Sequence, residues 1–115
     1  MIEKRKEGFV IITNEAEPKV RRRFTIAHEL AHFLLHKDQI SDGITENTLY
    51  RGGLSNRCEV EANRLAADIL MPLGKIEEYI NREGTAHVSL KGMADNFEVS
   101  ISAMTVRLGI PSNLY

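Results

Sequence analysis

The sequence predicts an α+β fold in which helices dominate and pack on a small sheet. One short run of apolar and β-branched residues, 8–13, is typical of a strand, whereas the other apolar residues recur mostly at helical spacing between residues 21 and 108. A chain of 115 residues can bury one modest core. We therefore expect one compact unit with several helices and few strands.

The first two elements follow directly from these patterns. The run from Gly8 to Thr13 is closed by Asn14 and predicts one well-buried strand. From Arg21 to His36, apolar residues at helical spacing broaden into a wide apolar face. This face predicts a helix that is largely buried.

A polar, glycine-containing stretch, residues 37–57, separates this helix from the next one. An unstructured loop as long as residues 37–57 would be unusual. Its segment 44–51 could therefore form a pair of short strands or another ordered structure. Ser55 or Asn56 can cap a second helix, which must stop before Pro72.

The remaining helices are predicted from their caps and ends. A third helix is expected through residues 76–80 and should end at Gly84. Two short helices are expected after it, each with a serine cap. The cap and helix pairs are Ser89 with residues 90–97 and Ser100 with residues 101–108.

Composition narrows the functional classes. The 15 Lys and Arg against 16 Asp and Glu give a formal net charge of -1, so no electrostatic field would hold a nucleic acid unaided. The single cysteine, Cys58, cannot form an internal disulfide, and the sequence has neither a signal-like leader nor a long apolar run. We therefore expect a cytoplasmic protein that does not enter a membrane.

The first predicted helix carries an H-E-x-x-H pattern formed by His28, Glu29 and His32. Histidines four residues apart project from one helix face, about a turn apart, which suits a single metal ion. Glu29 follows the first ligand, where its carboxylate can accept a proton from a metal-bound water. The pattern predicts a Zn²⁺ site that hydrolyses peptide bonds, with Glu29 as the catalytic base.

A catalytic zinc ion takes three protein ligands and keeps one open position, so a third donor should come from another element. Glu59 shares a face of the second predicted helix with small residues three and seven positions later, and such a face can pack closely against the first helix. Glu61 lies about 200° around the helix from Glu59 and is expected to face solvent. We therefore expect Glu59 to be the third ligand; the alternatives are Glu61, Asp68, Cys58 or no third protein ligand.

Other polar side chains have weaker claims to the site. His36 is expected to make structural hydrogen bonds, because a fourth protein ligand would take the position that water needs. Cys58, beside Glu59, is expected to be a small buried hydrophobe. The group that would stabilise an oxyanion is not identified by the sequence. Candidates by residue type alone are Tyr50, Arg51, Tyr79 and His87.

Two segments together resemble the ImmA/IrrE metallo-endopeptidase family. One runs from Arg23 to His32 and contains the H-E-x-x-H motif, and the other runs from Glu59 along an alanine-rich helix to Leu-Met-Pro at Pro72. The first motif is shared by many zinc peptidases, but its combination with the second is much more specific. The resemblance implies the same three metal ligands and the same catalytic glutamate as the spacing does.

The resemblance also implies a fold and a biological role. The expected fold is a zincin-like core over residues 1–84 with a helix-turn-helix-like segment over residues 85–115 packed on it. Members of the family cleave a helix-turn-helix repressor, often one encoded by a phage or an integrative element. A repressor-like protein is therefore the expected partner and substrate.

The terminal segment, residues 93–108, is similar to a helix-turn-helix, which the family commonly has at this place. Glu98 occupies the turn position where glycine is favoured, and the second helix offers only Arg107 as a basic side chain. We therefore expect this pair to pack or to dock a substrate rather than to bind DNA. Two rival hypotheses are a DNA-binding regulator with a vestigial metal site and a toxin-like or structural zinc module.

Overall fold

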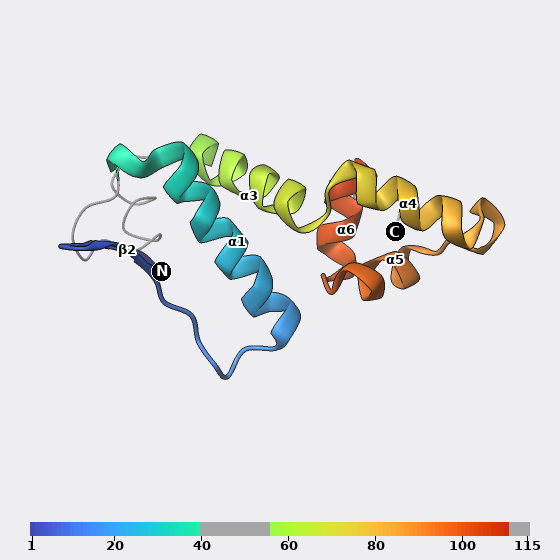
Figure 1. Cartoon of the computed structure of the whole chain (residues 1–115), viewed down its shortest axis with the longest axis horizontal. Helices are drawn as coiled ribbons and strands as arrows, with labels where there is room; N and C mark the ends of the chain where they lie inside the picture. The colour runs from blue at the N-terminus through green and yellow to red at the C-terminus, as the bar shows by residue number, and fades with distance from the viewer. Residues whose placement is uncertain (40–55, 111–115) are drawn as a thin grey trace. The chain divides into compact units, whose positions relative to one another are not determined.

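The computed structural model describes residues 1–39 and 56–110 of the chain. The helical majority and the small sheet of the predicted α+β class are confirmed (Figure 1). The possible strands at 44–51 and the possible cap Ser55 lie outside the described residues. In chain order the elements are β1 (Ile2–Arg5), β2 (Gly8–Ile11), α1 (Lys19–His36), the 3-10 turn η1 (Lys37–Gln39), α3 (Asn56–Leu70), α4 (Leu73–Glu83), the 3-10 turn η2 (Thr85–His87), α5 (Leu90–Phe97) and α6 (Ile101–Leu108).

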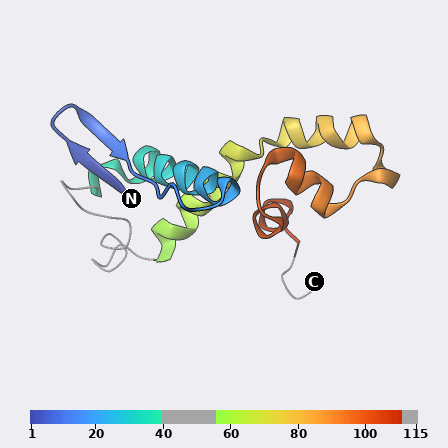
Figure 2. The same cartoon turned by 90° about the horizontal axis from the view of Figure 1, so that it is seen from below.

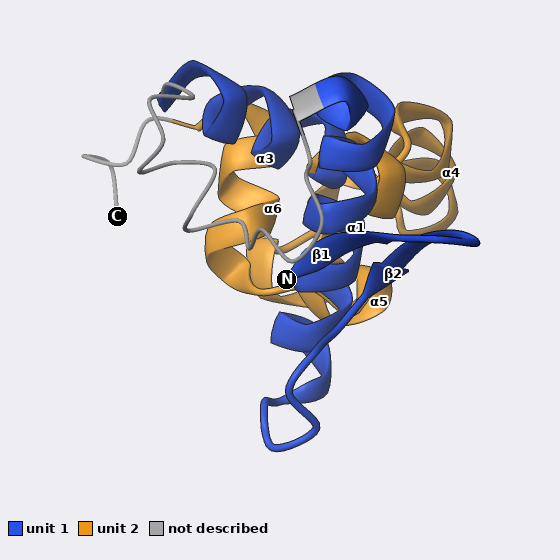
Figure 3. Ribbon diagram, turned by 90° about the vertical axis from the view of Figure 1, so that its left-hand side faces the viewer, with its two compact units in different colours: residues 1–66 blue, residues 67–115 orange. Residues whose placement is uncertain are grey.

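The chain forms two compact units, residues 1–66 and residues 67–115, which are coloured separately in Figure 3. The boundary falls inside α3, whereas the sequence placed a division after residue 84. The predicted domain division stays a prediction. Within the described ranges, no helix combines the length and the apolar character needed to cross a membrane.

The first unit begins with an antiparallel hairpin, which Figure 2 shows together with α1. Its register pairs Ile2 with Ile11 and Arg5 with Gly8. The sequence predicted a single strand here, because charged residues dominate β1 and leave Ile2 as its one apolar residue. The pairing with β2 stabilises this strand, and β2 itself is half-buried rather than well buried.

The apolar cluster of the first unit joins the hairpin to α1. Ile2 is fully buried, and Phe9, Ile11 and Phe33 pack against it. The rings of Phe9 and Phe33 meet edge to face, with their centroids 4.9 Å apart. This cluster fixes the position of the hairpin against α1.

Helix α1 begins two residues before the predicted start, directly after Pro18. Its buried positions are mostly small or polar, and its large apolar side chains Ile26, Leu30, Leu34 and Leu35 are exposed. The prediction of a largely buried helix is therefore wrong for this flank, since an apolar pattern does not say which neighbours will cover it. The buried residues are Ala27, His28, Glu29, Ala31, His32 and His36.

Helices α3 and α4 end where the sequence predicted. α3 stops at Leu70, before Pro72, and α4 stops before Gly84. Gly84 has a φ of 84°, which favours glycine, and its N–H donates to the carbonyl oxygen of Ile80 at 2.9 Å. Pro72 and Gly84 therefore delimit the third predicted helix.

Both serine caps of the last two helices are confirmed. The Oγ of Ser89 accepts from the N–H of Gly92 at 2.9 Å, and the Oγ of Ser100 accepts from the N–H of Ala103 at 3.0 Å. Glu98, at the turn between the two helices, adopts a left-handed conformation with a φ of 55°. The buried core of the second unit comprises Ala67, Met71, Ile76, Tyr79, Met93, Ala94, Val99 and Met104.

Candidate metal centre

Helix α1 brings two imidazoles together on its buried side. His28 and His32 are four residues apart, so their side chains lie on one face of the helix, one turn apart. Their Nε2 atoms are 3.1 Å apart, and their rings are nearly perpendicular, with centroids separated by 4.6 Å. Both side chains are buried.

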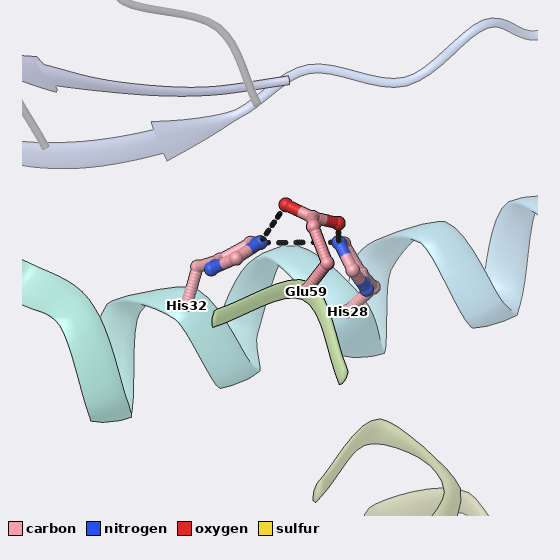
Figure 4. Close-up of side chains that lie close together, drawn as sticks. All are labelled: His28, His32 and Glu59. Carbon is pink, nitrogen blue, oxygen red and sulfur yellow. Dashed lines mark hydrogen bonds and ion pairs between the residues drawn. The ribbon is translucent and has the colours of Figure 1, made fainter. Parts of the chain in front are cut away.

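Helix α3 supplies a carboxylate to the same place. The Oε1 of Glu59 lies 3.1 Å from the Nε2 of His32, and its Oε2 lies 3.2 Å from the Nε2 of His28. Figure 4 shows the carboxylate of Glu59 lying across the two imidazoles, which extend from the other helix. All three residues belong to the first unit.

The three side chains fit a tetrahedral zinc ion. Zn–N and Zn–O bonds of about 2.0–2.1 Å place the donor atoms of neighbouring ligands about 3.3 Å apart. The separations of 3.1, 3.1 and 3.2 Å among the Nε2 atoms and carboxylate oxygens are close to that value. Two imidazoles and one carboxylate are also a donor set of catalytic zinc sites. The residues that the sequence singled out as ligands thus come together at spacings that suit one metal ion.

Glu29 lies next to this cluster in sequence, one residue after His28. Its side chain is fully buried on α1, and its Oε1 lies 3.7 Å from the amino group of Met1. Glu29 does not belong to the group of donors that includes Glu59 within the described residues. This separation from the ligand set is compatible with the base role expected from its position.

A second cluster adjoins the first one and consists of His36, Cys58 and Glu61. The Nδ1 of His36 lies 3.0 Å from the Nδ1 of His32, and the Nε2 of His36 lies 3.0 Å from the Oε1 of Glu61. The expected hydrogen-bonding role of His36 agrees with these contacts. Cys58 is half-buried, so the expectation of a buried side chain is wrong.

Glu61 combines exposure with a specific contact. The sequence predicted that it faces solvent, and its side chain is 44% exposed, yet one oxygen reaches His36. The hydrogen bond to His36 holds the pKa of the Glu61 carboxyl below its usual value, with a smaller contribution from the charge of Arg57, whose Nε lies 3.6 Å from Oε2. No local pattern predicts the pairing between His36 and Glu61, because it joins two helices.

The remaining candidates belong to the second unit or lie outside the described residues. Asp68 lies 3.5 Å from an arginine of α6 in the second unit. Tyr79 belongs to the core of the second unit, and His87 is exposed there. Tyr50 and Arg51 lie outside the described residues. The oxyanion-stabilising group therefore stays unassigned.

The fold and the site together define a small, mostly helical α+β domain of the H-E-x-x-H metal-binding class. The family model of the IrrE N-terminal-like domain, a peptidase family, matches residues 3–109. The chain belongs to the ImmA/IrrE family.

Three relatives illustrate this membership. The chain is 37% identical to the radiation response metalloprotease IrrE of Deinococcus radiodurans, over 91% of this chain and 33% of the relative. It is 35% identical to the protein of the same name from Deinococcus deserti, over 84% of this chain and 34% of the relative. An uncharacterized immunity region protein of Bacillus phage phi105 is 32% identical, over 70% of this chain and 49% of the relative.

The chain therefore spans between a third and a half of the length of these relatives. No solved structure matches it significantly.

Proposed function

We propose that this chain is a zinc-dependent endopeptidase in which His28, His32 and Glu59 hold the metal and Glu29 acts as general base. The observation that carries the proposal is the convergence of two imidazole nitrogens and both oxygens of one carboxylate from a second helix, at 3.1 to 3.2 Å. Membership in a peptidase family supports the same reaction class.

The proposed reaction uses this chain's side chains in distinct roles. Zinc bound by this donor set supplies a Lewis acid that lowers the pKa of water toward neutrality and polarises a carbonyl group. Glu29 accepts a proton from the attacking water and later donates it to the leaving amine. His28 and His32 of α1 and Glu59 of α3 would hold the metal.

We further propose that the substrate is a helix-turn-helix repressor-like protein of a phage or mobile element, cleaved in the cytoplasm. The relative from Bacillus phage phi105 bears the name of an immunity region protein, which is compatible with such a role. A peptidase acts on a protein or a peptide, so a polypeptide substrate follows from the proposed activity. The first substrate to test is a helix-turn-helix repressor, beginning with any that is encoded beside the gene of this chain.

The metal centre can be tested by elemental analysis of purified protein. We expect about one zinc ion per wild-type chain and a loss of that zinc from His28→Ala and Glu59→Ala, because three protein ligands are needed. The matched control is Glu77→Ala, which removes an exposed glutamate of α4. Full zinc content in either ligand variant would contradict the assignment.

The base is tested separately from the metal. Glu29→Gln preserves the size of the buried side chain but removes its ability to accept the proton, so cleavage of the repressor should fall by about 100-fold or more while zinc content is unchanged. Gel analysis of the cleavage products gives the rate, with Glu77→Gln as the control. Cleavage at the wild-type rate by Glu29→Gln would exclude this role.

The contacts of Arg107 argue against the rival DNA-binding function. Its Nε donates to the carbonyl oxygen of Met71 at 2.8 Å and lies 3.5 Å from Oδ1 of Asp68. This arginine, the one basic residue of α6, is therefore engaged within its own unit rather than presented to phosphates. Salt-sensitive binding to a specific DNA site that survives Glu29→Gln would favour the rival instead.

A further inference from the structure

His36 links the candidate metal centre to a carboxylate on the neighbouring helix. Its ring is buried between two partners, with Nδ1 at 3.0 Å from the Nδ1 of His32 and Nε2 at 3.0 Å from the Oε1 of Glu61. His32 in turn directs its Nε2 toward Glu59 and His28. Glu61, His36 and His32 therefore form a continuous chain of contacts that ends at the candidate metal centre.

The positions of the protons in this chain follow from the hydrogen-bonding capacity of imidazole. A histidine that binds a metal through Nε2 carries its proton on Nδ1 and donates it to a neighbouring acceptor. Between the two facing Nδ1 atoms, His32 must then be the donor and His36 the acceptor. A neutral His36 that accepts at Nδ1 carries its proton on Nε2, which can donate to the Oε1 of Glu61. Every atom along this path then has a partner of the correct type.

The same assignment argues against a second metal ion in the adjoining cluster. His36, Cys58 and Glu61 place potential ligand atoms within 4.8 Å of one another. However, His36 could offer only Nε2 to such an ion, and its proton would then sit on Nδ1 and face the N–H of His32. Two donors would oppose each other at 3.0 Å. Arg57, near Glu61, also adds positive charge beside that cluster.

We propose that His36, fixed by Glu61, is a positioning residue that holds the His32 imidazole in its Nδ1–H tautomer, with the Nε2 lone pair directed at the metal centre. The inference rests on the proposed metal site, and it adds a supporting pair that lies outside the ligand set. Partners of this kind orient the ligand ring and raise its basicity, and their loss typically lowers metal affinity by about 10–100-fold.

Two substitutions of nearly equal size separate this role from simple packing. His36→Leu removes the acceptor, whereas His36→Asn keeps an oxygen close to the position of Nδ1 that can accept from His32. We expect zinc affinity, measured by competition with a chromophoric chelator, to fall by about 10–100-fold in His36→Leu and to be largely retained in His36→Asn. A packing role predicts the reverse order, because leucine fills the buried site without a polar group to satisfy.

Wild-type protein loaded with Zn²⁺ gives a test that does not depend on the folding of a variant. Long-range ¹H–¹⁵N correlation spectra of the histidine rings report the tautomer of each ring. We expect His32 to carry its proton on Nδ1 and a neutral His36 to carry its proton on Nε2. A proton on Nδ1 of His36, or a metal bound at its Nε2, would overturn the inference.

The outcomes separate this inference from the proposed function. Wild-type protein that binds no zinc, or His28→Ala that binds it fully, would remove the metal centre and this inference with it. Wild-type protein that binds zinc through the expected ligands, combined with unchanged affinity in His36→Leu, would overturn the positioning role alone.

Discussion

The two units of the chain bury different kinds of side chain. In residues 1–66, four buried polar side chains gather on α1, beside a small apolar cluster around Ile2. In residues 67–115 the core is apolar, and the buried Thr105 donates its hydroxyl to the carbonyl oxygen of Ile101 at 2.7 Å. Buried polar groups destabilise a fold unless they find partners. We therefore expect the stability of the first unit to depend on the partners of its buried polar side chains. The stability of the second unit should depend on the packing of its apolar core.

The largest expected effect is that of metal removal on the first unit. Zinc in excess of its dissociation constant by about 1,000-fold would stabilise the folded state by about 4 kcal/mol, because only the folded chain presents all three ligands together. Amide hydrogen exchange should show α1 losing protection when a chelator is added, while α4, α5 and α6 keep theirs. The control is Glu59→Ala, in which the chelator should change nothing. An equal loss of protection in both units would contradict the comparison.

A smaller effect on stability is expected when a side chain is truncated in the apolar core of the second unit. Met104 is fully buried in α6, and Met104→Ala should reduce the free energy of unfolding by about 3 kcal/mol through lost contacts and a cavity. The matched control on the same helix is Val106→Ala, since Val106 is 69% exposed. Urea unfolding followed by circular dichroism measures the change. Loss of bound zinc in Met104→Ala would show that the metal centre depends on this core.

The smallest expected effect concerns the turn between α5 and α6. Glu98 adopts a left-handed conformation, which glycine reaches without a Cβ clash, so Glu98→Gly should raise the free energy of unfolding by about 1 kcal/mol. Glu98→Ala removes the same side chain atoms beyond Cβ but keeps the clash, and it should give no such gain. Thermal unfolding compares the two variants. Equal stability of both would indicate that the backbone conformation at this turn costs little.

Most helix boundaries could be predicted because they depend on residues close in sequence. Pro72 and Gly84 end helices through their own backbone restrictions, and Ser89 and Ser100 cap helices through hydrogen bonds that span three residues. The strand β1 could not be predicted in this way, since Ile2 gains its burial from a partner strand and from α1. Local pattern therefore specified the helical part of the fold better than the sheet.

The same distinction applies to the candidate site. The sequence by itself determined that His28 and His32 share one helix face, because helical periodicity alone puts residues four apart on one side, and it placed Glu29 directly after the first of them. Only the tertiary structure decided that Glu59 meets these imidazoles while Glu61 meets His36, since both contacts join α1 to α3 and depend on how two helices pack. It also decided that Ile26, Leu30, Leu34 and Leu35 of α1 are exposed, because burial is set by neighbours that a periodic pattern does not name.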